Sequence, residues 1–197
     1  MKFKGIIPEV KMSESIFSVS EILDRLEPYD IVSVNTSSLF DGSLMLLKCI
    51  RSKCPKKFLI RKDFIMIPRQ IKESKEAGAD AVLIIREFLT EIQYIKLLEE
   101  CEKNKIIPIT EIVKLIEHLQ EPILVNSRDL NDEIIWRKHA DALCLALKDK
   151  YKNVIYASGE NSDRVIKEGI ADAVLIGTAF VQDKIKGAKD VSKGGKE

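Results

Sequence analysis

The sequence lacks the features that mark membrane, exported and metal-binding proteins. Its longest apolar runs, such as AVLII and AVLIG, are far too short to cross a bilayer, and the N-terminal MKFKGIIPEVKM carries a charged residue every few positions. The four cysteines include no Cys-x-x-Cys pair, and the two histidines are remote from them, so metal-ligand spacing is absent. We therefore expect a cytoplasmic protein with reduced thiols, no membrane anchor and no metal.

An excess of charge of one sign is also lacking, since 32 Lys and Arg against 31 Asp and Glu leave a formal charge of +1. No global field attracts nucleic acid or anionic lipid, and a charged ligand must be bound by a local cluster. Apolar material is plentiful, because 45% of the 197 residues are hydrophobic. We expect one domain over residues 1–188 and a polar C-terminal tail over residues 189–197.

Short β-branched runs recur along the chain and alternate with segments of helical periodicity. The eight candidate strands are residues 5–11, 30–36, 57–62, 80–85, 105–110, 122–127, 153–158 and 172–177. Continuous apolar strands between amphipathic helices indicate a parallel sheet covered by helices. Eight such units favour closure into a (β/α)8 TIM barrel, with an open doubly wound sheet as the alternative. The first strand is followed by no Gly-rich dinucleotide motif, which also favours the barrel.

Polar residues accumulate where these strands end. Because residues two apart in a strand share a face, each of these polar residues shares a face with apolar residues earlier in its strand. The polar residues on these faces are Glu9 and Lys11 after Ile7, Lys62 after Ile60, Glu111 after Ile109, and Asn126 and Arg128 after Leu124. Any one of these charges alone would fit a solvated position just past a strand end. Together on inward faces they predict a partly desolvated pocket, in which Lys11 would lower the pKa of Lys62 or the glutamates would raise it.

Small residues follow the last two strands. Ser158 and Gly159 follow the seventh strand, and Gly177 and Thr178 follow the eighth. Backbone N–H groups and hydroxyls at these two corners are typical of barrels that hold a phosphate at a helix N-terminus. With Arg128 as a cationic partner, they predict a phosphorylated small-molecule ligand.

The segment FLIRKDFIMIPRQIKESKEAGADAVLII resembles the third-strand to fourth-strand region of indole-3-glycerol-phosphate synthase. The resemblance continues in order through PEVK, VNTSSLFDGS, PITEI, NSRDL and LIGTAF, and it covers nearly the whole chain. It implies a phosphate-binding barrel that works without a cofactor in tryptophan biosynthesis. The implied reaction is that of a carboxy-lyase, in which 1-(2-carboxyphenylamino)-1-deoxyribulose 5-phosphate loses carbon dioxide and water to give indole-3-glycerol phosphate.

The resemblance also implies roles for individual residues. Lys62 would be the general acid of ring closure, Glu111 the acid or base of the later step, and Lys11 the partner of the anthranilate carboxylate or a helper in dehydration. Glu9 and Asn126 would hydrogen-bond the reacting core. The implied phosphate-binding residues are Arg128, Ser158, Gly159, Gly177 and Thr178.

Four positions depart from the family pattern. Met12 and Glu14 replace a cationic and a hydroxyl residue in the first loop, Ser37 stands where an acidic residue is usual, and Ala157 replaces the glutamate before Ser158. The resemblance also implies a short form that lacks most of an N-terminal extension. The surface thereby uncovered would suit a second copy of the chain or another enzyme of the pathway.

Two other functions stay open on these residues. One is an isomerase or epimerase acting on a sugar phosphate in the same type of barrel, which would need a different base and would leave the RKDF match unexplained. The other is a degenerate barrel that binds a phosphorylated metabolite or a partner enzyme without turnover. The methyl group of Ala157 and the altered first loop favour this second alternative.

Overall fold

A computed structural model of the chain describes residues 2–12, 18–128, 135–157 and 162–177. Eight parallel strands close into a single barrel in sequence order, with the first strand hydrogen-bonded to the eighth. The strands are β1 (Gly5–Val10), β2 (Ile31–Asn35), β3 (Phe58–Lys62), β4 (Ala81–Ile85), β5 (Ile107–Ile112), β6 (Ile123–Asn126), β7 (Val154–Ala157) and β8 (Ala173–Ile176). The predicted (β/α)8 barrel is confirmed, and the open sheet is excluded.

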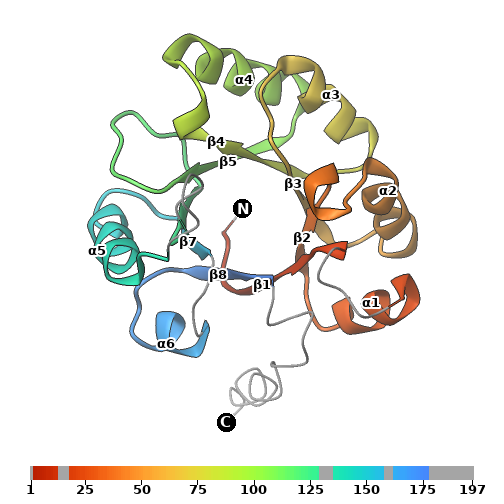
Figure 1. The fold of residues 1–197 in the computed structure, drawn as a ribbon, viewed down its shortest axis with the longest axis horizontal. Coiled ribbons are helices and arrows are strands. Elements are labelled where there is room, and N and C mark those ends of the chain that lie inside the picture. The colour runs from red at the N-terminus through yellow and green to blue at the C-terminus, as the bar shows by residue number, and fades with distance from the viewer. Residues whose placement is uncertain (1, 13–17, 129–134, 158–161, 178–197) are drawn as a thin grey trace.

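Helices surround the ring of strands, as Figure 1 shows in a view along the barrel. The α-helices are α1 (Val19–Leu26), α2 (Leu44–Lys53), α3 (Pro68–Glu76), α4 (Glu91–Asn104), α5 (Arg137–Lys148) and α6 (Ser162–Lys167), and single 3-10 turns η2 (Ser38–Phe40) and η3 (Arg86–Phe88) follow β2 and β4. Among the described residues, no helix is both long and apolar enough to span a membrane. The expected tail over residues 189–197 lies outside the described residues.

Local signals in the sequence set several helix boundaries. Thr90 begins α4 with a capping box, because its hydroxyl accepts from the Gln93 backbone N–H and the Gln93 side chain accepts from the Thr90 N–H. Lys105 ends α4 in the left-handed conformation, with φ of 51°. The fifth strand therefore begins at Ile107 rather than at the predicted residue 105, and it continues to Ile112. Glu111 thus lies inside the strand, where the barrel fixes its direction.

The core divides into an interior and an outer shell. Outward-facing strand residues such as Val34 and Tyr156 pack with the helices in two apolar clusters. Inward-facing residues form a third cluster that fills the barrel. Phe3 is fully buried in this cluster and packs edge-on against Phe58, the first residue of β3, with ring centroids 5.7 Å apart. The interior is therefore a packed floor at the end where the strands begin, and a site can form only at the other end.

Candidate active site

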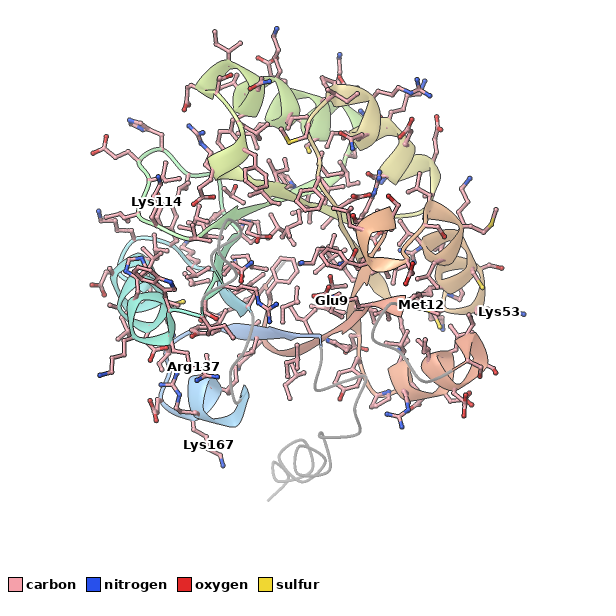
Figure 2. The ribbon with its side chains drawn as sticks, in the orientation of Figure 1. Glu9, Met12, Lys53, Lys114, Arg137 and Lys167 are labelled. Carbon is pink, nitrogen blue, oxygen red and sulfur yellow. The ribbon has the colours of Figure 1, made fainter. Side chains whose placement is uncertain are left out.

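The strand residues that the sequence predicts to share an inward face do face the interior of the barrel. The interior cluster contains these apolar residues that precede the predicted polar ones: Ile7, Ile60, Ile109, Leu124 and Ile155. Figure 2 shows Glu9 on the inner side of the ring, whereas Lys53, Arg137 and Lys167 lie on the outer helices. One pleat further along β1, β3 and β5, the interior changes from apolar to charged at Glu9, Lys62 and Glu111.

Glu9 and Lys62 meet across the interior of the barrel. The Lys62 Nζ lies 3.8 Å from Glu9 Oε1, and the Asn35 amide donates to the same oxygen over 3.1 Å. Asn35 is itself held by the Ser37 N–H, which donates to its Oδ1 over 3.1 Å. Glu9, at the end of β1, is only 6% exposed. A buried carboxylate therefore has both a charged partner and a neutral hydrogen-bond donor, as a stable buried ion requires.

Glu111 and Asn126 form the second pair, from β5 and β6. The Asn126 amide donates to Glu111 Oε1 over 2.7 Å, and the Asn126 Oδ1 accepts from the Arg128 backbone N–H over 3.0 Å. Glu111 is 1% exposed, and its second oxygen has no hydrogen-bond partner among the described residues. That oxygen is a polar group available to a ligand or to a proton.

The two carboxylates control the protonation of Lys62. Burial alone would lower the pKa of Lys62, and the Arg128 charge acts in the same direction. The carboxylates of Glu9 and Glu111 outweigh both effects and raise the pKa of Lys62 above its ordinary value of 10.5. Lys62 is thus an ammonium group at neutral pH. Of the two directions that the sequence left open, the structure favours the one set by the glutamates.

Burial has the opposite consequence for Glu111. Loss of solvent raises the pKa of this carboxyl above its ordinary value of 4.5, while Lys62 and the Asn126 amide work against the rise. Glu87 and Glu9 add to the rise through their negative charge. The site therefore contains a protonated Lys62 beside a carboxyl group that holds its proton to higher pH than an exposed glutamate does.

Lys11 lies just past β1, at the rim of the barrel. Its Nζ sits 4.3 Å from the centre of the Phe40 ring, in the turn that follows β2. Lys11 thus lies beside the turn that follows β2, at the open end of the barrel. A cation at this height suits an anionic group at the outer end of a ligand.

The predicted phosphate-binding residues are described only in part. Arg128 is half-buried beside Asn126, and its Nε has no partner among the described residues. Gly177 lies against Glu9, because a Cβ added to this glycine would sit 3.6 Å from Glu9 Oε2. A longer side chain at position 177 would crowd the carboxylate. Ser158, Gly159 and Thr178 lie outside the described residues.

Sequence reasoning missed Asn35 and Glu87. Asn35 ends β2 on the inward face and pairs in register with Lys62, so the same alternation rule would have found it. Glu87 comes after β4 in η3, where no strand pattern applies. Within the described residues, no group of three or more His, Cys, Asp or Glu side chains is arranged to hold a metal ion. Proton transfer and charge recognition are what these side chains can perform.

Comparison with known proteins identifies one family. The family model described as indole-3-glycerol phosphate synthase matches residues 8–191. A relative of that name from Nautilia profundicola is 34% identical over 209 residues, covering 97% of this chain and 76% of the relative. Another from Petrotoga mobilis is 31% identical over 168 residues, covering 78% of this chain and 66% of the relative. The chain thus spans between about two thirds and three quarters of the length of these relatives.

Solved structures add a likeness of fold. 3-Hexulose-6-phosphate synthase from Salmonella typhimurium superposes with a TM-score of 0.68 at 18% identity, covering 91% of this chain and 90% of that one. KGPDC from Streptococcus mutans superposes with a TM-score of 0.63 at 13% identity, covering 93% of this chain and 98% of that one. At such low identity these structures show a shared barrel and leave the chemistry to the side chains.

Proposed function

This chain belongs to the indole-3-glycerol phosphate synthase family, and we propose that it catalyses the ring closure for which the family is named. The substrate would be 1-(2-carboxyphenylamino)-1-deoxyribulose 5-phosphate, and the products indole-3-glycerol phosphate, carbon dioxide and water. The observation that carries the proposal is the buried ammonium of Lys62, held 3.8 Å from Glu9, whose carboxylate raises the pKa of Lys62. Ring closure needs such a donor.

Lys62 would act in the first step. The aromatic carbon that bears the carboxylate attacks the ribulose carbonyl, a carbon–carbon bond forms, and negative charge develops on the carbonyl oxygen. A positioned ammonium stabilises that charge and donates a proton to it. Glu9 holds Lys62 in place as its counter-ion at 3.8 Å, and Asn35 holds Glu9 through a hydrogen bond of 3.1 Å. Loss of carbon dioxide then restores the aromatic ring, and the neutral Lys62 takes up a proton from solvent, which is the proton that the overall reaction consumes.

Glu111 would act in the dehydration that follows. The new hydroxyl leaves as water only if it receives a proton, and a carboxyl group with a raised pKa keeps its proton to higher pH than an exposed glutamate and can donate it. Asn126 orients this carboxyl by donating to Oε1, which leaves Oε2 for the substrate. The C1′ proton of the substrate is lost as the indole double bond forms, and its transfer to Glu111 restores the protonated carboxyl.

The anionic ends of the substrate would meet local cations. Lys11 at the rim would bind the anthranilate carboxylate, and Arg128 would bind the phosphate together with Ser158, Gly159, Gly177 and Thr178. The near-neutral net charge of the chain makes these cations necessary, because no general positive field attracts the substrate. No cofactor takes part in this scheme.

One observation favours the non-catalytic alternative. Ala157 is the last residue of β7 and is buried on the inward face of the strand, where the family pattern has a glutamate. A barrel that kept the phosphate corner and lost this carboxylate would bind the phosphorylated ligand without turnover. Binding of a reduced, unreactive substrate analogue by a protein that forms no product would support this second function.

The test follows indole fluorescence on incubation with the carboxyphenylamino substrate. We expect turnover by the unchanged chain and a loss of about 10²- to 10⁴-fold in kcat for Lys62→Ala, which is the range for removing a general acid. Lys53→Ala on the outer face of α2 is the matched control and should keep full activity. Full activity in a folded Lys62→Ala variant would remove Lys62 from this role.

A further inference from the structure

Glu87 lies in η3, directly after the end of β4. It lies two residues after Ile85, which pairs in register with Glu111 on β5. Its Oε1 accepts a hydrogen bond of 2.7 Å from the backbone N–H of Val113, two residues after Glu111. The pairing of β4 with β5 is thus continued by a side chain, and the Glu87 carboxylate is held against the strand that carries Glu111.

Glu87 and Glu111 are bonded in the same incomplete way. Each carboxyl uses one oxygen, Glu87 for the Val113 N–H and Glu111 for the Asn126 amide, both over 2.7 Å. The second oxygen of each is buried and has no partner among the described residues. If both carboxyls were ionised, two buried oxygens would carry negative charge without a hydrogen bond. A proton on Glu111 relieves part of that cost, and the nearby charge of Glu87 favours this proton.

The other charged groups around Glu111 do not remove this effect. Lys62 from β3 favours the ionised form of Glu111, whereas Glu9 from β1 disfavours it. Arg128 acts on Lys62, and the adjoining β4 residue Ile85 carries no charge. His139 of α5 reaches the same segment through Nε2, which lies 3.1 Å from the Val113 carbonyl oxygen. Burial of Glu111 is the largest influence on its pKa and raises it. Lys62 and the Asn126 amide oppose this rise, and Glu87 and then Glu9 add to it.

We propose that Glu87 is a positioning residue which favours the protonated form of Glu111, so that Glu111 can act as the proton donor. The role given to Glu111 rests on the proposed function, whereas the influence of the Glu87 charge on Glu111 does not. In the dehydration step the O–H bond of Glu111 breaks, the carbon–oxygen bond of the substrate hydroxyl breaks, and water leaves. Repulsion from Glu87 then favours return of a proton to Glu111, which prepares the next turnover.

The decisive experiment needs no substrate. The Glu111 carboxyl is titrated by carbon-13 NMR in the unchanged chain, in Glu87→Gln and in Glu117→Gln. Glu87→Gln keeps an oxygen for the Val113 N–H and removes only the charge, while Glu117 is exposed in the loop after β5. We expect the pKa of Glu111 to fall in Glu87→Gln and to stay unchanged in Glu117→Gln. An unchanged pKa in both variants overturns the proposal.

A second variant covers the case in which Glu87→Gln does not fold. Glu87→Asp keeps the charge but withdraws it by one methylene, so we expect a smaller fall in the pKa of Glu111. If Glu87→Gln does not fold and the pKa of Glu111 is unchanged in a folded Glu87→Asp, the proposed influence of Glu87 on Glu111 is overturned.

Turnover supplies the independent readout. In Glu87→Gln, the limb of the kcat profile on which activity falls with rising pH should move to lower pH, while KM stays the same. A purely structural role of Glu87 would lower kcat at every pH without moving that limb, and would overturn the proposal. A shifted NMR titration in a chain with no turnover would leave the carboxyl pair standing and refute the proposed function alone.

Discussion

Arg61 and Asp63, the neighbours of Lys62 on either side, form an ion pair that points away from the site. The Arg61 Nη2 lies 2.8 Å from Asp63 Oδ2, and both side chains are nearly buried between β3 and α3. Arg61 also donates to the Thr36 hydroxyl and to the Gln70 carbonyl oxygen. The RKDF segment therefore has two functions, because alternate residues hold the strand to its helix while Lys62 enters the barrel.

Replacing Asp63 should lower the free energy of unfolding. Asp63→Asn leaves the buried guanidinium of Arg61 without its counter-ion, and breaking a buried pair in this way typically costs about 3–5 kcal/mol. Urea unfolding would measure the loss. The matched control is Glu73→Gln, which breaks the exposed Arg69–Glu73 pair and should cost no more than about 1 kcal/mol. Equal losses in the two variants would contradict the structural role given to the Arg61 pair.

Glu111 should make stability depend on pH. Its pKa in the folded protein is raised above the ordinary value of 4.5, so the folded state binds more protons than the unfolded state in the window between the two values. Stability is therefore full below pH 4.5 and falls as pH rises through the folded pKa. Glu111→Gln keeps the Asn126 hydrogen bond and removes the titration.

The variant should be more stable than the unchanged chain at neutral pH and equal to it in acid, while its turnover falls. Free energies of unfolding from urea at a series of pH values measure the difference, with Glu117→Gln as the exposed control. A difference that grows toward low pH would have the wrong sign and would refute the raised pKa of Glu111.

Ala157 is the position at which a new carboxylate should improve turnover. It ends β7 on the inner face, where it pairs in register with Asn126 of β6 and Leu175 of β8. We expect Ala157→Glu to raise kcat/KM severalfold, because it returns the glutamate of the family pattern to this wall of the site. Ala157→Gln has the same size without the charge and should give no gain. A loss in both variants would mean that the pocket is built around the alanine methyl group.

The sequence predicted more of this site than of its surroundings. Strand alternation identified Glu9, Lys62, Glu111 and Asn126, because the inward direction repeats every second residue and needs no knowledge of neighbouring strands. The same rule was not extended to Asn35, which supports Glu9 from the adjacent strand. The fifth strand was predicted two residues too early, since the left-handed Lys105 delays it.

The sequence by itself determined eight strands, their order along the chain and the face on which each polar residue lies, because these properties follow from local periodicity. Only the tertiary structure decided which charges meet. Closure of the barrel brings Glu9 of β1 beside Lys62 of β3, and the pairing of β4 with β5 sets Glu87 against the segment that follows Glu111. Burial and the charges of Glu9, Lys62 and Glu87 then shift the pKa values of the site, and these influences depend on distances between residues that are far apart in the sequence.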